Sequence, residues 1–293
     1  MDNKLPGTRK IKAAIKSMRL RTLPLSLAGV VLGCKLALAE WQVSGWVVAL
    51  ICLTTVCLQI LSNLSNELGD VLRGTDTADR QGPAYGLNSG EMSVAQMRWL
   101  IRGFVALCCG FGAVMIWVSY GTLFCLPALA LLALGAAAIW AAMHYTLGRN
   151  PYGYRGLGDI FVFIFFGLVS VMGAYFVCAH TLDSWELVLP AAGIGFFSVG
   201  VLNINNIRDM KTDAANRVTV ALQLGLRRAR IYQTALICLG WLALIAYASR
   251  WWFLLTLPLY IWHLRGVWTR TDAALDRYFP LLVLGTFALA LLY

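Results

Sequence analysis

Long apolar segments separated by shorter polar ones dominate the chain. A helix needs about 20 residues to cross the hydrocarbon core of a bilayer, and a soluble helix of that length would show a polar face at a period of about 3.6 residues. The segments lack such a face, so the pattern predicts an all-α fold: a polytopic membrane helical bundle with about nine transmembrane helices. The expected spans are roughly 22–39, 46–66, 99–119, 121–143, 157–178, 186–204, 230–248, 251–266 and 279–293.

Composition agrees with a lipid environment. Of the 293 residues, 59% are hydrophobic and 13% are charged, and the mean hydropathy is +0.70. A soluble domain carries about 25% charged residues. No linker or low-complexity stretch divides the chain, so we expect residues 1–293 to form a single membrane domain, with a basic segment at 1–20 ahead of the first span.

The basic residues predict the orientation in the membrane, because cytoplasmic loops are the ones rich in Lys and Arg. If the N-terminus is cytoplasmic, all but three of the 24 Lys and Arg residues (Lys35, Arg102 and Arg250) fall in cytoplasmic segments. We therefore expect a multi-pass protein of the inner or plasma membrane with its C-terminus outside. Ala37-Leu38-Ala39 resembles a signal-peptidase site, but removal of the first span would disturb this alternation, so we expect no cleavage.

The net charge of +10 is accounted for by basic loops next to anionic lipid headgroups. We therefore expect the lipid bilayer, and no nucleic acid, as the partner of these charges.

A first polar cluster lies at the inner end of the second expected span. Its members are spaced four, three and four residues apart, which puts them on one stripe of a helix. Facing lipid, that stripe would cost on the order of several kcal/mol, so we expect it to face the bundle interior or a wet cavity. Beyond it, Gly74 allows a turn that brings Asp76 and Asp79 back toward the stripe. The stripe consists of Gln59, Asn63, Asn66 and Asp70.

A second cluster follows the sixth expected span, where Asn205, Asp209 and Asp213 stand at i, i+4 and i+8. Carboxylate and amide oxygens are hard ligands that suit Mg²⁺. This ion takes one or two protein carboxylates and leaves its other positions to water and substrate phosphate. The two clusters together therefore predict a site that holds one diphosphate through Mg²⁺, with nearby Arg and Lys on the remaining phosphate oxygens.

Two readings from other classes compete with this one. A cation or proton transporter also carries Asn and Asp inside its spans, but it needs ionisable groups near the middle of the membrane, and here they gather at one face. A non-catalytic lipid-binding scaffold would bind the same ligand without turnover.

The two motifs resemble those of the UbiA superfamily of intramembrane aromatic prenyltransferases. The likeness runs from Arg21-Thr22-Leu23-Pro24 to Leu224-Gly225. Asn66-Glu67-Leu68-Gly69-Asp70, with Asp76 after a gap of five residues, is similar to the branch that acts on 1,4-dihydroxy-2-naphthoate. So are the second motif and the segment from Asn150 to Asp159. The chain departs from the pattern at Glu67, where Asp is usual, and at Asn216-Arg217, where Gly-Lys is usual.

This resemblance implies Mg²⁺-dependent transfer of a polyprenyl group from polyprenyl diphosphate to 1,4-dihydroxy-2-naphthoate. Diphosphate and CO₂ leave, and the product is demethylmenaquinone, an intermediate of menaquinone biosynthesis. The alternative within the superfamily is another aromatic acceptor, such as 4-hydroxybenzoate or homogentisate. The implied catalytic residues are Asp70, Asp76, Asp209 and Asp213, and the implied metal ligands are these four together with Asn66 and Asn205.

The remaining expected contacts are with substrate. Arg80, Arg208, Lys211 and Arg217 are expected to hold phosphate, beside Asn66 and Asn205. An allylic carbocation needs aromatic faces and a dry apolar wall, for which Tyr145, Tyr152 and Tyr154 are the candidates by position. Arg155 or Asp159 is expected to orient the acceptor.

Overall fold

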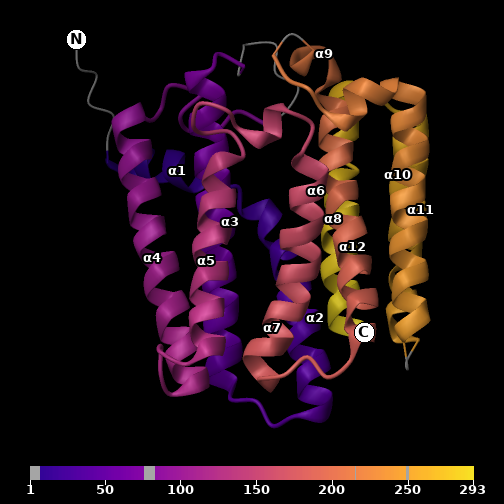
Figure 1. The fold of residues 1–293 in the computed structure, drawn as a ribbon. Coiled ribbons are helices and arrows are strands. Elements are labelled where there is room, and N and C mark those ends of the chain that lie inside the picture. Colours follow the sequence, from indigo (N-terminus) through magenta and orange to yellow (C-terminus); the bar gives the residue numbers. More distant parts are fainter. Residues whose placement is uncertain (1–6, 76–82, 215, 249–250) are drawn as a thin grey trace.

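The computed structural model describes residues 7–75, 83–214, 216–248 and 251–293, and this part of the chain is helical with no strand beyond one isolated bridge (Figure 1). The α-helices are α1 Gly7–Ser17, α2 Leu23–Glu40, α3 Gly45–Leu72, α4 Val94–Tyr120, α5 Leu126–His144, α6 Gly158–Val162, α7 Ser170–Ala179, α8 Val188–Arg208, α9 Met210–Asp213, α10 Val220–Tyr247, α11 Leu257–Thr269 and α12 Phe279–Leu292. Short 3₁₀ turns are η1 Leu20–Thr22, η2 Tyr152–Tyr154, η4 Trp185–Leu187, η5 Trp252–Thr256 and η6 Asp272–Leu275, and η3 Phe163–Val169 is a π-helical stretch between α6 and α7.

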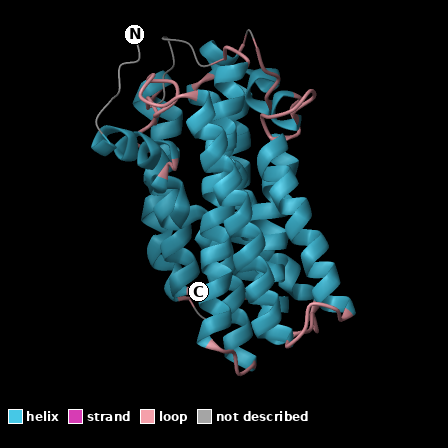
Figure 2. Ribbon diagram, turned by 90° about the vertical axis from the view of Figure 1, so that its left-hand side faces the viewer, coloured by secondary structure: helices cyan, strands magenta, loops and turns pink. Residues whose placement is uncertain are grey.

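Within the described residues, eight helical stretches are long and apolar enough to cross a membrane. They match eight of the nine expected spans, which confirms the all-α membrane bundle. The expected span 251–266 corresponds to η5 and α11, which run beside α10 but do not reach the length and apolarity of the other eight (Figure 1). The long helices lie roughly parallel, with the loops at the two ends of the bundle (Figure 2).

The short helix α1 lies across one end of the bundle, the end at which α3 and α8 finish (Figure 1). Its apolar Ile11 and Ile15 are 63% and 46% exposed, while Ala13 is fully buried against the bundle. Lysines 10, 12 and 16 occupy the same helix. A basic helix with an uncovered apolar face at the end of a membrane bundle is suited to the membrane–water interface.

The most deeply buried span is the one that contains α8, which packs against α2, α10, α12 and η3. Close approach to η3 depends on glycine, because a Cβ at Gly167 would lie 2.6 Å from the Cα of Gly195. On the other side, the ring of Phe197 packs against those of Trp241 and Tyr260, at centroid distances of 6.2 and 4.7 Å. The helix that carries the second polar cluster is therefore held on several sides.

Helix ends differ from the expected spans where polar residues are buried. α3 continues to Leu72, six residues past the expected end, because Glu67 and Asp70 are buried by neighbouring loops. α10 begins at Val220, ten residues before the expected start, and has a kink at Gly225, whose φ of 71° lies in the region that favours glycine. As a result, the first polar cluster lies on one continuous helix.

Candidate active site

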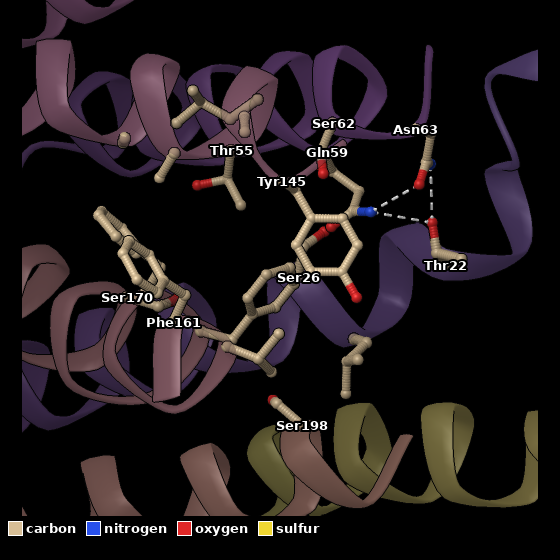
Figure 3. Close-up of a pocket in the computed structure, with 18 of the residues that line it drawn as sticks. Thr22, Ser26, Thr55, Gln59, Ser62, Asn63, Tyr145, Phe161, Ser170 and Ser198 are labelled. Atoms are coloured by element: carbon tan, nitrogen blue, oxygen red, sulfur yellow. Dashed lines mark hydrogen bonds between the residues drawn. The ribbon is translucent and has the colours of Figure 1, made fainter. Parts of the chain in front are cut away.

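A cavity of about 410 Å³ extends from the ends of α3 and α8 into the bundle. Its polar end carries the side chains of both clusters, and its interior is apolar, with a few hydroxyl groups such as those of Ser26, Thr55 and Ser170 (Figure 3). The carboxylates that line it lie at one end, not halfway along the spans, which is the arrangement expected of a diphosphate site and not of an ion path. Apolar lining residues include Leu131, Leu134, Ala138, Phe161, Phe165, Phe166 and Val169.

The first cluster lies along the cavity as the spacing predicts. All four stripe residues of α3, from Gln59 to Asp70, line the cavity. The loop after α5 packs directly on this helix: a Cβ at Gly69 would lie 2.4 Å from Thr146 Oγ1. Thr146 Oγ1 in turn donates to the Ser65 carbonyl over 2.9 Å. This contact fixes the position of the α5–α6 loop relative to the first motif.

The second cluster also reaches the cavity, although its helix is interrupted. α8 ends at Arg208, and the single turn α9 continues to Asp213. The i to i+4 pattern survives the break, because Asp209 N donates to Asn205 O and Asp213 N donates to Asp209 O, both over 2.9 Å. Asn205, Asp209 and Asp213 therefore line the same cavity as Asn66 and Asp70.

Arg217 joins the two motifs. Its guanidinium donates to Asp70 Oδ1, and its Nε lies 4.0 Å from Asp213 Oδ1. Tyr154 donates its hydroxyl to the same Asp70 oxygen over 2.8 Å and lies with its ring 4.5 Å below the guanidinium. Burial alone would lower the pKa of Arg217, but the carboxylates of Asp70 and Asp213 outweigh it and raise the pKa above its usual value. The side chain therefore remains a cation between two anions.

A second ion-pair network holds the second motif. Arg208, which is 5% exposed, donates to both carboxylate oxygens of Asp209 over 2.9 and 2.7 Å. Its third nitrogen donates to Asp276 over 2.6 Å, and Asp276 also accepts from Arg21 over 2.9 Å. The network thus ties the start of the first span and the loop before α12 to the end of α8.

Tyr145 is the aromatic residue next to the polar end of the cavity. Gly153 allows the following loop to wrap around it, since a Cβ there would lie 2.6 Å from Tyr145 O and 2.9 Å from its ring. Tyr152 packs edge-on against the Tyr145 ring at 5.4 Å and also lines the cavity. Burial raises the pKa of Tyr145 to about 12, so its phenol stays neutral and presents an uncharged ring.

Three expected substrate contacts lie away from the cavity. Arg155 is exposed, and Asp159 is buried where it accepts a hydrogen bond from Tyr232 over 2.9 Å. Lys211 is exposed and pairs with Asp272 at 2.9 Å. None of the three is among the described residues that line the cavity. Their positions in the sequence suited the expectation, but tertiary packing directs Arg155 and Lys211 to the surface and Asp159 to another helix.

Some residues of the first motif have other positions. Asp76, Asp79 and Arg80 lie outside the described residues. Glu67 is fully buried and accepts from the backbone nitrogens of Leu87 and Asn88, over 2.6 and 3.3 Å. It therefore anchors the α3–α4 loop instead of lining the cavity.

Sequence reasoning missed Arg19 and Asp276. Arg19 lines the cavity and adopts a left-handed backbone, with φ 49°, at the junction of α1 and η1. The uncommon backbone is the signal of a constrained site, but it has no counterpart in the sequence pattern. Asp276 lies in the loop before the last span, where nothing in the local pattern predicts that it meets Arg208.

The residues present fit a Mg²⁺ ion that shares its coordination with diphosphate and water. Five hard oxygen-bearing side chains line the polar end of the cavity. Within the described residues, no three His, Cys, Asp or Glu side chains are close enough to form a metal site by themselves. A protein that supplies few ligands of its own suits an ion that is brought and completed by substrate phosphate.

Fold and site together define a class: an intramembrane helical bundle with two acidic motifs at the mouth of an apolar cavity. The model of the UbiA prenyltransferase family matches residues 26–291, so the chain belongs to that family. The 1,4-dihydroxy-2-naphthoate octaprenyltransferase of Haemophilus influenzae is 39% identical over 275 residues, which cover 90% of this chain and 88% of that protein. The enzyme of the same name from Escherichia coli is 39% identical over 271 residues, with 90% and 87% covered.

Solved structures share the fold. The apo structure of a UbiA homologue from Aeropyrum pernix has a TM-score of 0.71 at 16% identity, and the match covers 92% of this chain and 96% of that one. A UbiA homologue from Archaeoglobus fulgidus, bound to GPP and Mg²⁺, has a TM-score of 0.62 at 16% identity, with 95% and 99% covered.

Proposed function

We propose that this protein transfers a polyprenyl group from polyprenyl diphosphate to 1,4-dihydroxy-2-naphthoate, releasing diphosphate and CO₂ and giving demethylmenaquinone. The observation that carries the proposal is the meeting of both acidic motifs at the polar end of one largely apolar cavity. The relatives at 39% identity bear the name of this activity, which supports the choice of acceptor over 4-hydroxybenzoate and homogentisate.

Breaking the allylic C–O bond requires stabilisation of a highly charged leaving group. Asp70, Asp209 and Asp213, with Asn66 and Asn205, would hold Mg²⁺, which neutralises charge on the diphosphate when bound. Arg217 is already between Asp70 and Asp213, so its guanidinium is close enough to donate to phosphate oxygens brought to the same carboxylates. The role of Arg208 is to hold Asp209 through two hydrogen bonds.

Ionisation leaves an allylic carbocation that must be kept from water. The neutral ring of Tyr145 borders the polar end of the cavity, and Tyr152 packs against it. An aromatic face stabilises a cation, and the apolar walls contributed by Phe161, Phe165 and Phe166 exclude solvent. The ring of the acceptor then attacks the cation, and loss of CO₂ restores its aromaticity.

The apolar interior also accounts for the membrane setting. The long tail of the donor stays in hydrocarbon, while its diphosphate meets the loops at the ends of α3 and α8. The excess of Lys and Arg in the loops at this end supports a cytoplasmic site in the inner or plasma membrane.

The test is an acceptor screen on purified protein in lipid vesicles, with pyrophosphate release and product mass as the readouts. Release is expected only with Mg²⁺, a polyprenyl diphosphate and 1,4-dihydroxy-2-naphthoate together. A product formed faster with 4-hydroxybenzoate or homogentisate would overturn the assigned acceptor. Binding of the donor without any product from any acceptor would favour a lipid-binding scaffold.

A further inference from the structure

One wall of the cavity carries a small hydrogen-bond network between η1 and α3. Gln59 Nε2 donates to Thr22 Oγ1 over 3.2 Å and to Asn63 Oδ1 over 3.0 Å (Figure 3). Asn63 Nδ2 donates to Thr22 Oγ1 over 3.0 Å and to Met18 O over 2.8 Å. Thr22 Oγ1 donates its own proton to Arg19 O over 2.9 Å. Gln59 and Asn63 are 8% and 4% exposed, and both line the cavity with Thr22.

The network fixes which way both amides point. A hydroxyl has one proton to donate, and that of Thr22 is used by the Arg19 carbonyl, so Thr22 only accepts from Gln59 and Asn63. Both amide groups must therefore turn their nitrogens toward Thr22. Both protons of the Gln59 nitrogen are used in this way, and its carbonyl oxygen is on the other side of the amide.

That oxygen has no donor in the network. Among the described residues, none donates to Gln59 Oε1, although the atom is buried. A buried amide oxygen without a donor costs about 1–3 kcal/mol, so its retention in a cavity wall indicates a ligand. A fixed acceptor atom selects an N–H or O–H group and discriminates against an ether or an unsubstituted carbon at the same place.

We infer that Gln59 Oε1 accepts a hydrogen bond from a ring hydroxyl of the aromatic acceptor, so that Gln59 selects hydroxylated rings. The inference rests on the proposed function, because the aromatic acceptor is the substrate that carries hydroxyl donors. At 1.5 Å per residue along α3, Gln59 lies about 10 Å from Asn66 and about 16 Å from Asp70. That distance places the acceptor deeper in the cavity than the diphosphate. Arg19 lines the same cavity and brings positive charge toward an acceptor that carries a carboxylate.

The experiment compares Gln59→Leu with the unaltered enzyme in vesicles. The probes are 1,4-dihydroxy-2-naphthoate and its two single-hydroxyl analogues, 1-hydroxy-2-naphthoate and 4-hydroxy-2-naphthoate, used as competitive inhibitors. In the unaltered enzyme, loss of the hydroxyl that meets Gln59 should raise the dissociation constant about tenfold or more relative to the parent compound. In Gln59→Leu, that difference should fall below about twofold, and the KM of the donor should stay within about twofold.

The control is Thr54→Val, on the same helix and cavity wall. The Thr54 hydroxyl donates to its own helix, at Leu50 O over 2.8 Å, so its loss should leave the discrimination between analogues unchanged. Equal discrimination in the unaltered enzyme and in Gln59→Leu would overturn the inference, because a purely structural role weakens all three compounds alike. The absence of discrimination in the unaltered enzyme would overturn it too. Failure of the proposed function is distinguishable: the unaltered enzyme would then release no pyrophosphate with the parent acceptor, which would overturn both.

Discussion

Asp70 and Asp209 each have an arginine as hydrogen-bonding partner, and the two pairs differ in what else they hold. Arg217 spans Asp70 and Asp213 across the cavity mouth, whereas Arg208 is bound on its other side by Asp276. A guanidinium held on both sides by carboxylates keeps its position. We therefore assign Arg208 to holding the motif and Arg217 to contact with substrate.

Replacing Asp70 or Asp209 with Asn should lower turnover about 100-fold or more. The substitution keeps the shape of the side chain but removes the charge that metal binding needs. Mg²⁺-dependent pyrophosphate release measures the effect, and thermal unfolding in detergent checks that the variants are folded. Asp183→Asn, on an exposed residue at the other end of the bundle, is the control and should behave as the unaltered protein. Retention of full Mg²⁺-dependent activity in either variant would contradict the assigned role.

Arg217→Gln should raise the KM of the donor about tenfold, whereas Arg217→Lys should stay within about threefold. Lysine keeps the positive charge between Asp70 and Asp213, but Gln leaves two carboxylates without it. Steady-state kinetics with varied donor gives the comparison. If Gln and Lys have equal effects, the charge at position 217 is not what the donor meets.

At this scale the sequence predicted residues of regular spacing and missed those brought in by tertiary packing. The spacing of Asn66 and Asp70 predicted that they share a face, because side chains four apart on a helix point the same way. Asp159 is itself one residue into a helix, yet it faces Tyr232 on α10. Asp276 meets Arg208, which is 68 positions away. No local pattern contains such partners.

At the scale of helices, the second motif depends on a loop that is remote in sequence. η6 and Asp276 come just before α12, and Asp276 is shared by Arg208 and Arg21. The carboxylate thus couples the end of α8 to the start of α2. Its removal leaves a buried guanidinium with one partner fewer, which is costly.

Asp276→Asn should lower kcat/KM about tenfold, or ~1.4 kcal/mol, without changing the membrane insertion. Asp272→Asn is the matched control on the same loop, since Asp272 pairs with the exposed Lys211 and such pairs are worth little. Asp272 has φ 51°, a conformation that Asn tolerates. Kinetics of both variants side by side decide the matter: equal losses would show that the loop itself, not the bond to Arg208, is what counts.

Helix positions were predicted far better than helix ends. Apolar length fixes a span because the backbone must satisfy its own hydrogen bonds in lipid. Ends depend on where polar groups find partners, as Glu67 does with the α3–α4 loop, and this allowed α3 to continue past its expected end. The π-helical stretch Phe163–Val169 also left no mark in the apolar pattern, because it changes the winding of a span and not its hydrophobicity.

At the scale of the whole molecule, the bundle has one end with polar chemistry and one with short connections. The loops after α3 and α8 lie at the end that also carries α1, and the α7–α8 connection lies at the other end (Figure 1). The distribution of Lys and Arg assigns the first end to the cytoplasm.

Single cysteines at Ser89 and Lys211, both exposed, should react with a membrane-impermeant maleimide only from the cytoplasmic side. A cysteine at Leu182, exposed at the opposite end, should react only from outside. Labelling of intact cells and of inside-out vesicles gives the comparison, in a background where the exposed Cys109 and Cys238 are replaced by Ala. Labelling of positions 89 and 211 from different sides would refute the assigned orientation.

The helix α1 has a consequence for how this protein behaves outside its native lipid. Only Met18 to Arg21 separate α1 from Thr22, the residue that orients Gln59. One wall of the binding chamber is thus tethered to an element that rests on headgroups, and detergent offers that element neither a flat surface nor fixed anions. Preferences among ring compounds measured in micelles and in acidic phospholipid therefore belong to two differently supported forms of the same catalyst.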